Sequence, residues 1–284
     1  MVILTRRKPS KLHIGTAGIP ISTPKKTTPE GVKRVAELDL DAMEIEFVRG
    51  VRMSEQLALK TREVANELNV LLTVHAPYYI NLLSPDESKV KASIKRIIDS
   101  ARIGYLAGAW SVVFHPGYYG KLKSDEAVRI VRNHIKEIVK MLRDQGIEIW
   151  VRPEIMGGLS EFGSLDEILE VVNGIDMAAP CIDFAHLYAR TLGEYNNYEK
   201  FREVLSKVEE RLGREALDNA HIHVSGMEYG SRGEKKHLNF NESMFNWRDV
   251  VKVVKEFNVK GVVISESPNL EGDAILFKKE YESV

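Results

Sequence analysis

Short apolar runs rich in β-branched residues recur along this chain and alternate with longer amphipathic stretches. The runs cover residues 12–19, 42–48, 71–77, 111–117, 148–155, 179–187, 220–226 and 261–267. Between them, stretches such as 54–69 and 124–146 repeat apolar residues every three or four positions, the spacing of one helical face. Eight strands that alternate with helices predict a (β/α)₈ barrel, formed as a single domain over residues 1–284.

A doubly wound open sheet is the alternative fold, but no GxGxxG motif follows the first apolar run. The single cysteine, Cys181, excludes an internal disulfide and fits a reducing cytoplasm. No uncharged apolar run approaches the roughly 18 residues of a membrane span. We expect a cytoplasmic protein. We also expect it to act as a monomer. The net charge of −1 means that any nucleic-acid binding must come from a local cluster of basic residues.

Ionisable residues stand where most of the predicted strands end, and this end of a (β/α)₈ barrel carries the active site. They are His75, His115, Glu154, Asp183, His186, His221, His223 and Glu266. Each one alone is more readily explained as a packed or solvated side chain. Together, so many ionisable groups at one rim would be desolvated at large cost unless a cation bound them. Mixed imidazole and carboxylate ligands suit Zn²⁺, with Mn²⁺ or Fe²⁺ as alternatives.

The motifs that contain these residues resemble those of the endonuclease IV family of apurinic/apyrimidinic endonucleases, which belongs to the xylose-isomerase-like barrels. The motifs are HAPYYINL (75–82), HPG (115–117), CIDFAHL (181–187) and SESPN (265–269). The resemblance extends over nearly the whole chain in the same order. It implies a zinc-dependent hydrolase with two or three metal ions, which cleaves double-stranded DNA on the 5′ side of an abasic site during DNA repair.

The resemblance also implies a role for each position. His75 and His115 are expected to hold one metal ion, and Glu154 to bridge that ion to a second. The expected remaining ligands of the second ion are Asp183, His221 and Glu266, while His186 belongs to a third site. Glu154 and Glu266 are the expected catalytic residues. His223 shares a strand face with His221 because side chains alternate with a period of two, and we expect a supporting or substrate contact from it.

The third site departs from the family pattern. The family completes it with an Asp-x-His pair after a GSR triplet, whereas here Gly230–Arg232 is followed by GEKKHL. Glu234 stands at the Asp position, Lys236 at the His position, and His237 one residue later. Two outcomes stay open: the loop shifts so that His237 is the ligand, or the site is absent and Lys236 partly replaces its charge.

Four positions are expected to contact DNA. Tyr78 matches a tyrosine that the family inserts into DNA at the lesion, although packing over the barrel mouth is the alternative. Arg49 and Arg52 follow the second predicted strand, near the position of a DNA-contacting arginine of the family. Together with Lys236 they would supply positive charge for the phosphates.

Two other functions stay open. A sugar isomerase or epimerase with one divalent metal would use the quartet of Glu154, Asp183, His221 and Glu266, with two carboxylates moving a proton between sugar carbons. Such an enzyme has no need of His75 and His115, so these histidines favour the nuclease. A metal-dependent DNA-binding protein without catalysis is the third possibility.

Overall fold

The computed structural model describes residues 9–284, in which strands and helices alternate along the chain. The strands are β1 (Leu12–Ala17), β2 (Ala42–Glu46), β3 (Leu71–His75), β4 (Ser111–Phe114), β5 (Trp150–Pro153), β6 (Cys181–Asp183), β7 (Ala220–Val224), β8 (Gly226–Gly230), β9 (Gly233–Leu238) and β10 (Gly261–Ser265). The helices are α1 (Thr28–Glu37), α2 (Glu55–Leu68), α3 (Glu87–Leu106), α4 (Ser124–Asp144), α5 (Leu165–Val172), α6 (Phe184–Arg190), α7 (Tyr198–Leu212), α8 (Arg214–Leu217), α9 (Trp247–Glu256) and α10 (Glu271–Ser283), with a 3₁₀ turn η1 (Phe240–Glu242).

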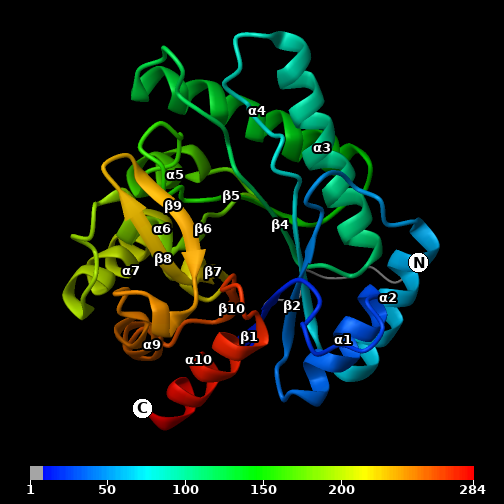
Figure 1. Ribbon diagram of the computed structural model, residues 1–284. Helices are drawn as coiled ribbons and strands as arrows, with labels where there is room; N and C mark the ends of the chain where they lie inside the picture. Colours follow the sequence, from blue (N-terminus) through cyan, green and yellow to red (C-terminus); the bar gives the residue numbers. More distant parts are fainter. Residues whose placement is uncertain (1–8) are drawn as a thin grey trace.

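Eight of these strands form one parallel sheet in the order β5-β4-β3-β2-β1-β10-β7-β6. The outer strands β5 and β6 meet through two parallel bridges, Val151–Ala178 and Glu154–Cys181. Because these bridges join the two edges, the sheet closes on itself, and the helices lie around its outside (Figure 1). The predicted (β/α)₈ barrel is confirmed, and the open doubly wound sheet is excluded.

Helix α4 illustrates how the sequence pattern produces the outer layer. Its buried residues Ala127, Val131, Ile135 and Ile138 recur every three or four positions and form one apolar stripe. The strand β10 is instead buried along its whole length, as expected for a parallel strand covered by helices outside and by side chains inside the barrel. Among the described residues, none of the helices combines the length and the hydropathy of a membrane span.

The hairpin β8–β9 occupies a segment that the sequence suggested would be a loop, and it packs against α6. Glu228 pairs with Lys236, but the next residue, Tyr229, pairs with Glu234, so Lys235 is an extra residue in β9. Such a β-bulge inverts the alternation of side chains on one strand. It therefore turns Glu234 and His237, three residues apart, toward the same face of the hairpin.

Asp41 connects the first two strands at the opposite end of the barrel from the predicted site. Its Oδ1 accepts the backbone N–H of Ile14 at 2.8 Å, and its Oδ2 lies 2.5 Å from Lys11 Nζ and 3.3 Å from His13 Nδ1. Burial opposes the charged carboxylate, but the contacts from His13, Lys11 and Ile14 lower the pKa of Asp41 to about 2.

We expect Asp41→Asn to lower the free energy of unfolding by about 2 kcal/mol at pH 7. Because the folded-state pKa is depressed, the stabilisation is present above the unfolded pKa of about 3.8 and is lost as pH falls toward 2. The difference from wild type in urea unfolding should therefore shrink between pH 5 and pH 3. The exposed Asp39→Asn is the matched control, and an equal loss in both variants would contradict the account.

Candidate metal centre

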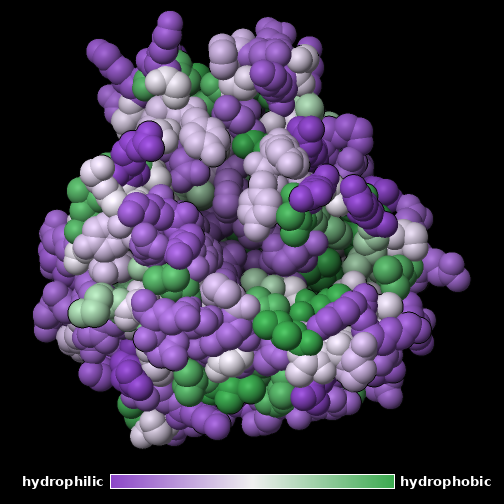
Figure 2. Space-filling view, viewed as in Figure 1, coloured by the Kyte–Doolittle hydropathy of each residue, from purple (hydrophilic) through white to green (hydrophobic). Residues whose placement is uncertain are grey.

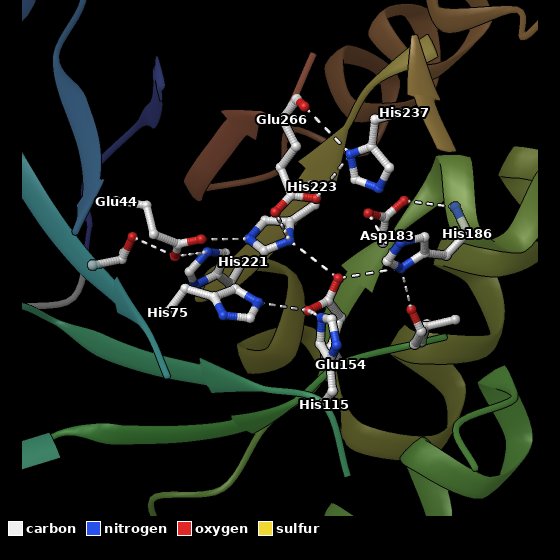
Figure 3. Close-up of polar contacts among 12 residues, drawn as sticks. Glu44, His75, His115, Glu154, Asp183, His186, His221, His223, His237 and Glu266 are labelled. Atoms are coloured by element: carbon white, nitrogen blue, oxygen red, sulfur yellow. Dashed lines mark hydrogen bonds and ion pairs between the residues drawn. The ribbon is translucent and has the colours of Figure 1, made fainter. Parts of the chain in front are cut away.

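Glu154 lies at the centre of the carboxyl end of the barrel, directly after β5, and its side chain is fully buried. Its Oε2 lies 3.2 Å from Nε2 of both His75 and His115. Its Oε1 lies 3.2 Å from Nδ1 of His186 and 3.3 Å from Nδ1 of His223. Figure 3 shows these side chains, which come from different barrel elements, converging on the one carboxylate. Each carboxylate oxygen thus faces two imidazole rings.

Besides a deeper set of Cys181, His221 and His223, the potential ligand atoms at the rim form three adjacent groups, and within each group they all lie within 4.8 Å of one another. The groups are His75–His115–Glu154, Glu154–Asp183–His223–Glu266 and His186–Glu234–His237. Glu154 belongs to the first two groups, so its two oxygens can serve two ions. His186 in turn contacts Glu154 through Nδ1 and Glu234 through Nε2, the latter at 3.2 Å, and so links the third group to the others.

Local backbone contacts orient several of these side chains. The Nδ1 of His75 lies 2.8 Å from the carbonyl oxygen of Ala76, which leaves Nε2 directed at Glu154. Asp183 ends β6 and caps α6, and its Oδ1 accepts the backbone N–H of His186 at 2.7 Å. A second ring contact that holds a histidine in place is typical of metal ligands.

The β-bulge sets which side chain of β9 faces the third group. His237 Nε2 lies 3.4 Å from Glu234 Oε1, and both residues face His186. Lys236 points away, is exposed, and pairs with Glu228 at 3.4 Å. The structure therefore places His237, and not Lys236, beside Glu234 and His186.

The placement of His221 differs from the expectation. His221 Nε2 lies 3.1 Å from Glu44 Oε2, and Nδ1 lies 2.7 Å from Ser111 Oγ, deeper in the barrel. It is His223 that joins Asp183, and these two residues are register partners across β6 and β7. Both histidines face the interior of the barrel, but they are two positions apart along β7, a distance of about 7 Å. Only the one nearer the carboxyl end reaches the rim.

Two carboxylates of β2 were not anticipated from the sequence. Glu44 is fully buried inside the barrel, and Glu46, at the end of the strand, is partly buried beside the metal-ligand groups. Their spacing in AMEIEF was the available signal, because residues two apart on a strand face the same side. Burial, together with the charges of Glu44 and Glu266, outweighs the attraction of His75 and raises the pKa of Glu46 to about 8.

The electrostatics of the groups fit a bound cation. Burial disfavours the charged form of Glu154, but the imidazoles of His223 and His115 hold its pKa well below the usual range. Burial of Asp183, with the charges of Glu266 and Glu154, outweighs the attraction of His186 and raises the pKa of Asp183 to about 6. Its Oδ2 is buried and has no hydrogen-bond partner among the described residues. A divalent cation would satisfy this oxygen and offset the crowded negative charge.

The groups lie at a hollow in the barrel mouth that is bordered mainly by hydrophilic residues (Figure 2). Tyr78 is 55% exposed there, and its ring centroid lies 5.8 Å from that of His115. Arg49 and Arg52 are exposed and line a hollow of about 460 Å³ that Glu46 also borders. Tyr78 and the two arginines thus lie exposed at this end of the barrel, and Lys236 pairs with Glu228.

Comparison with known sequences finds both uncharacterized proteins and proteins named as endonucleases. An uncharacterized protein of Methanocaldococcus jannaschii is 44% identical over 273 residues, which cover 96% of this chain and 98% of that protein. A protein of Aquifex aeolicus named probable endonuclease 4 is 25% identical and covers 78% of both chains.

Solved structures show the same fold. Endonuclease IV from Thermus thermophilus superposes with a TM-score of 0.71 at 19% identity and covers 95% of this chain and 100% of that one. A D-tagatose 3-epimerase-like protein superposes with a TM-score of 0.70 at 25% identity and covers 91% and 94%. The family model described as xylose isomerase-like TIM barrel matches residues 32–281. With the closed barrel and a match over most of its length, this chain belongs to the xylose isomerase-like TIM barrel family.

Proposed function

We propose that this protein is a metal-dependent phosphodiesterase of the endonuclease IV type, which cleaves double-stranded DNA on the 5′ side of abasic sites. The observation that carries the proposal is the position of Glu154 between two ligand groups. One group contains His75 and His115, and the other contains Asp183, His223 and Glu266. A one-metal isomerase needs only the second group, whereas phosphodiester hydrolysis at a multi-metal site uses both.

The ligand atoms suit Zn²⁺ best, because histidine nitrogens and carboxylate oxygens are both represented in each of the three groups at the rim. Two ions would occupy the groups that share Glu154, and the His186–Glu234–His237 group offers a third position. Mn²⁺ and Fe²⁺ accept the same kinds of ligand. When bound, such ions act as Lewis acids toward a phosphoryl oxygen and lower the pKa of a water molecule to about 7.

The protein's own residues position the reaction. Glu154 and Glu266 both belong to the second ligand group, where they would orient an attacking water toward the phosphorus atom. Tyr78 lies over the first group and is exposed enough to enter a gap in a base stack. Arg49 and Arg52 supply positive charge at the rim for the DNA phosphates. Relatives that carry the name probable endonuclease 4 support this assignment. We also expect a monomer that acts in the cytoplasm.

A duplex with one abasic site tests the proposal. We expect the zinc-loaded protein to nick it on the 5′ side of the lesion, and EDTA to stop the reaction. An intact duplex of the same sequence, without the lesion, is the control. A duplex that stays whole at saturating metal and protein concentrations would refute the proposed nuclease.

A sugar epimerase is the second candidate, and one observation favours it. Glu154, Asp183, His223 and Glu266 form a one-metal quartet with two carboxylates that could exchange a proton with a sugar carbon. A solved D-tagatose 3-epimerase-like protein also shares 25% of its residues with this chain. Conversion of a ketose into its epimer, in a sample that leaves abasic DNA whole, would establish this function instead.

Replacing Tyr78 should affect lesion preference more than overall DNA binding. We expect Tyr78→Ala to lose about tenfold in its preference for abasic over intact duplex, because stacking of an aromatic ring is worth about 1–3 kcal/mol. The neighbouring Tyr79 is 65% exposed, so Tyr79→Ala is the matched control. Competition binding measures both. Equal preference in wild type and Tyr78→Ala would show that Tyr78 only packs against the rim.

A further inference from the structure

A buried carboxylate below the ligand groups contacts both histidines of β7. Glu44 on β2 is fully buried, and its Oε1 lies 2.9 Å from His223 Nε2. Its Oε2 lies 3.1 Å from His221 Nε2 and accepts the hydroxyl hydrogen of Thr73 at 2.7 Å. Glu44 is therefore held between β2, β3 and β7 inside the barrel (Figure 3).

The two ring nitrogens of His223 have different surroundings. Nδ1 lies 3.3 Å from Glu154 Oε1 and 3.4 Å from Glu266 Oε1, within the second ligand group. Nε2 faces Glu44, on the side away from that group. An imidazole binds a cation only through a nitrogen without a proton. Which nitrogen carries the proton therefore decides whether His223 can be a ligand.

We propose that Glu44 is a positioning residue for the second metal site. Its Oε1, 2.9 Å from His223 Nε2, favours a proton on that nitrogen, and so favours the tautomer that presents the Nδ1 lone pair to a cation. The contact has the distance of an ion pair but not the geometry of a hydrogen bond, and neither atom has a hydrogen-bond partner among the described residues. Carboxylate partners of this kind orient histidine ligands and raise their basicity.

His221 contributes to the same arrangement from the other side. Its Nδ1 lies 2.7 Å from Ser111 Oγ, so the serine hydroxyl can donate to Nδ1 while Nε2–H faces Glu44. Glu44 thus contacts three side chains from two strands: Thr73 of β3, whose hydroxyl donates to Oε2, and His221 and His223 of β7. The contacts with the two histidines hold the carboxylate in one place, and the position of the carboxylate sets the orientation of His223.

The wild-type protein provides the first test. We expect ¹⁵N-histidine NMR of the zinc-loaded protein to show His223 with its proton on Nε2 and the metal on Nδ1. A proton on Nδ1, or metal bound through Nε2, would overturn the proposal. This measurement requires no variant, so it decides the question even where a substitution at Glu44 prevents folding.

Metal affinity provides the second test. We expect the metal-free Glu44→Gln variant to bind one zinc equivalent about 10–100-fold more weakly than wild type in competition with a chromophoric chelator. The amide retains the size of the side chain but cannot accept from both histidines. Thr73→Val is the matched control, because it removes a different donor of Glu44 and leaves the contact with His223 in place. We expect it to change the affinity less than threefold.

Unchanged zinc affinity in Glu44→Gln would overturn the proposal, and so would an equal loss in Thr73→Val, which would indicate a general effect of core substitutions. The proposal rests on the metal-dependent function proposed above, but its tests measure metal binding and not cleavage. An abasic duplex that stays whole would therefore refute the nuclease assignment and leave the role of Glu44 standing.

Discussion

The Glu154→Gln variant is expected to lose at least about 10³-fold in metal-dependent cleavage and to retain less than half of the bound metal. The reason is that the carboxylate of Glu154 faces four imidazole rings and belongs to both main ligand groups. Metal ions stabilise a phosphoryl-transfer transition state by several kcal/mol, and each 1.36 kcal/mol is a factor of ten in rate. Single-turnover cleavage and metal analysis of the same sample measure the two effects.

The control for this variant is Glu228→Gln, which removes an exposed carboxylate from the hairpin and leaves the ligand groups intact. We expect wild-type metal content in that control. A Glu154→Gln protein that is folded by circular dichroism and still holds the wild-type amount of metal would contradict the shared position of Glu154.

His115→Ala is expected to have the second largest effect, and it separates the two candidate functions. His115 belongs to the first ligand group only, so its loss should remove about one metal equivalent and lower phosphodiester cleavage at least about 10²-fold. The quartet of Glu154, Asp183, His223 and Glu266 stays complete in this variant. An epimerase would therefore keep most of its activity.

His134→Ala is the matched control, because His134 lies on α4 outside the ligand groups and pairs with Glu137. We expect it to behave as wild type. If His115→Ala keeps both its full metal content and its activity on abasic DNA, the first group is not a metal site.

The barrel and most of its rim could be predicted because each depends on local pattern. A strand of parallel sheet buried on both sides is a short apolar run, and a covering helix shows one apolar stripe. A residue that ends such a run, as His75, Asp183 and Glu266 do, must lie at the rim of the closed sheet. These positions therefore follow from the chain order alone.

Depth within the barrel could not be predicted in the same way. His221 and His223 share one face of β7, so periodicity treats them as equivalent, and only the register with Asp183 shows that His223 is the one at the rim. Glu44 was missed because its partners, Thr73 and His221, come from other strands. The sequence carries no signal for such a long-range contact until the register of the barrel is known.

The place of His237 depends on a single irregularity. A regular strand would turn Glu234 and His237 to opposite faces, because they are three residues apart. The bulge at Lys235 reverses this, and it reflects the pairing between β8 and β9, which no local motif specifies. The two outcomes for the third group could therefore be stated from the sequence but not decided.

Anomalous diffraction from crystals of the zinc-loaded protein, recorded at the zinc edge, tests the central claim most directly. We expect one peak bonded to His75, His115 and Glu154, and a second bonded to Glu154, Asp183, His223 and Glu266, with bonds of about 2.0–2.2 Å. A third peak beside His186, Glu234 and His237 would complete the centre. A single peak within the Asp183 group, with none beside His75 and His115 at saturating zinc, would contradict the multi-metal phosphodiesterase and favour the one-metal epimerase.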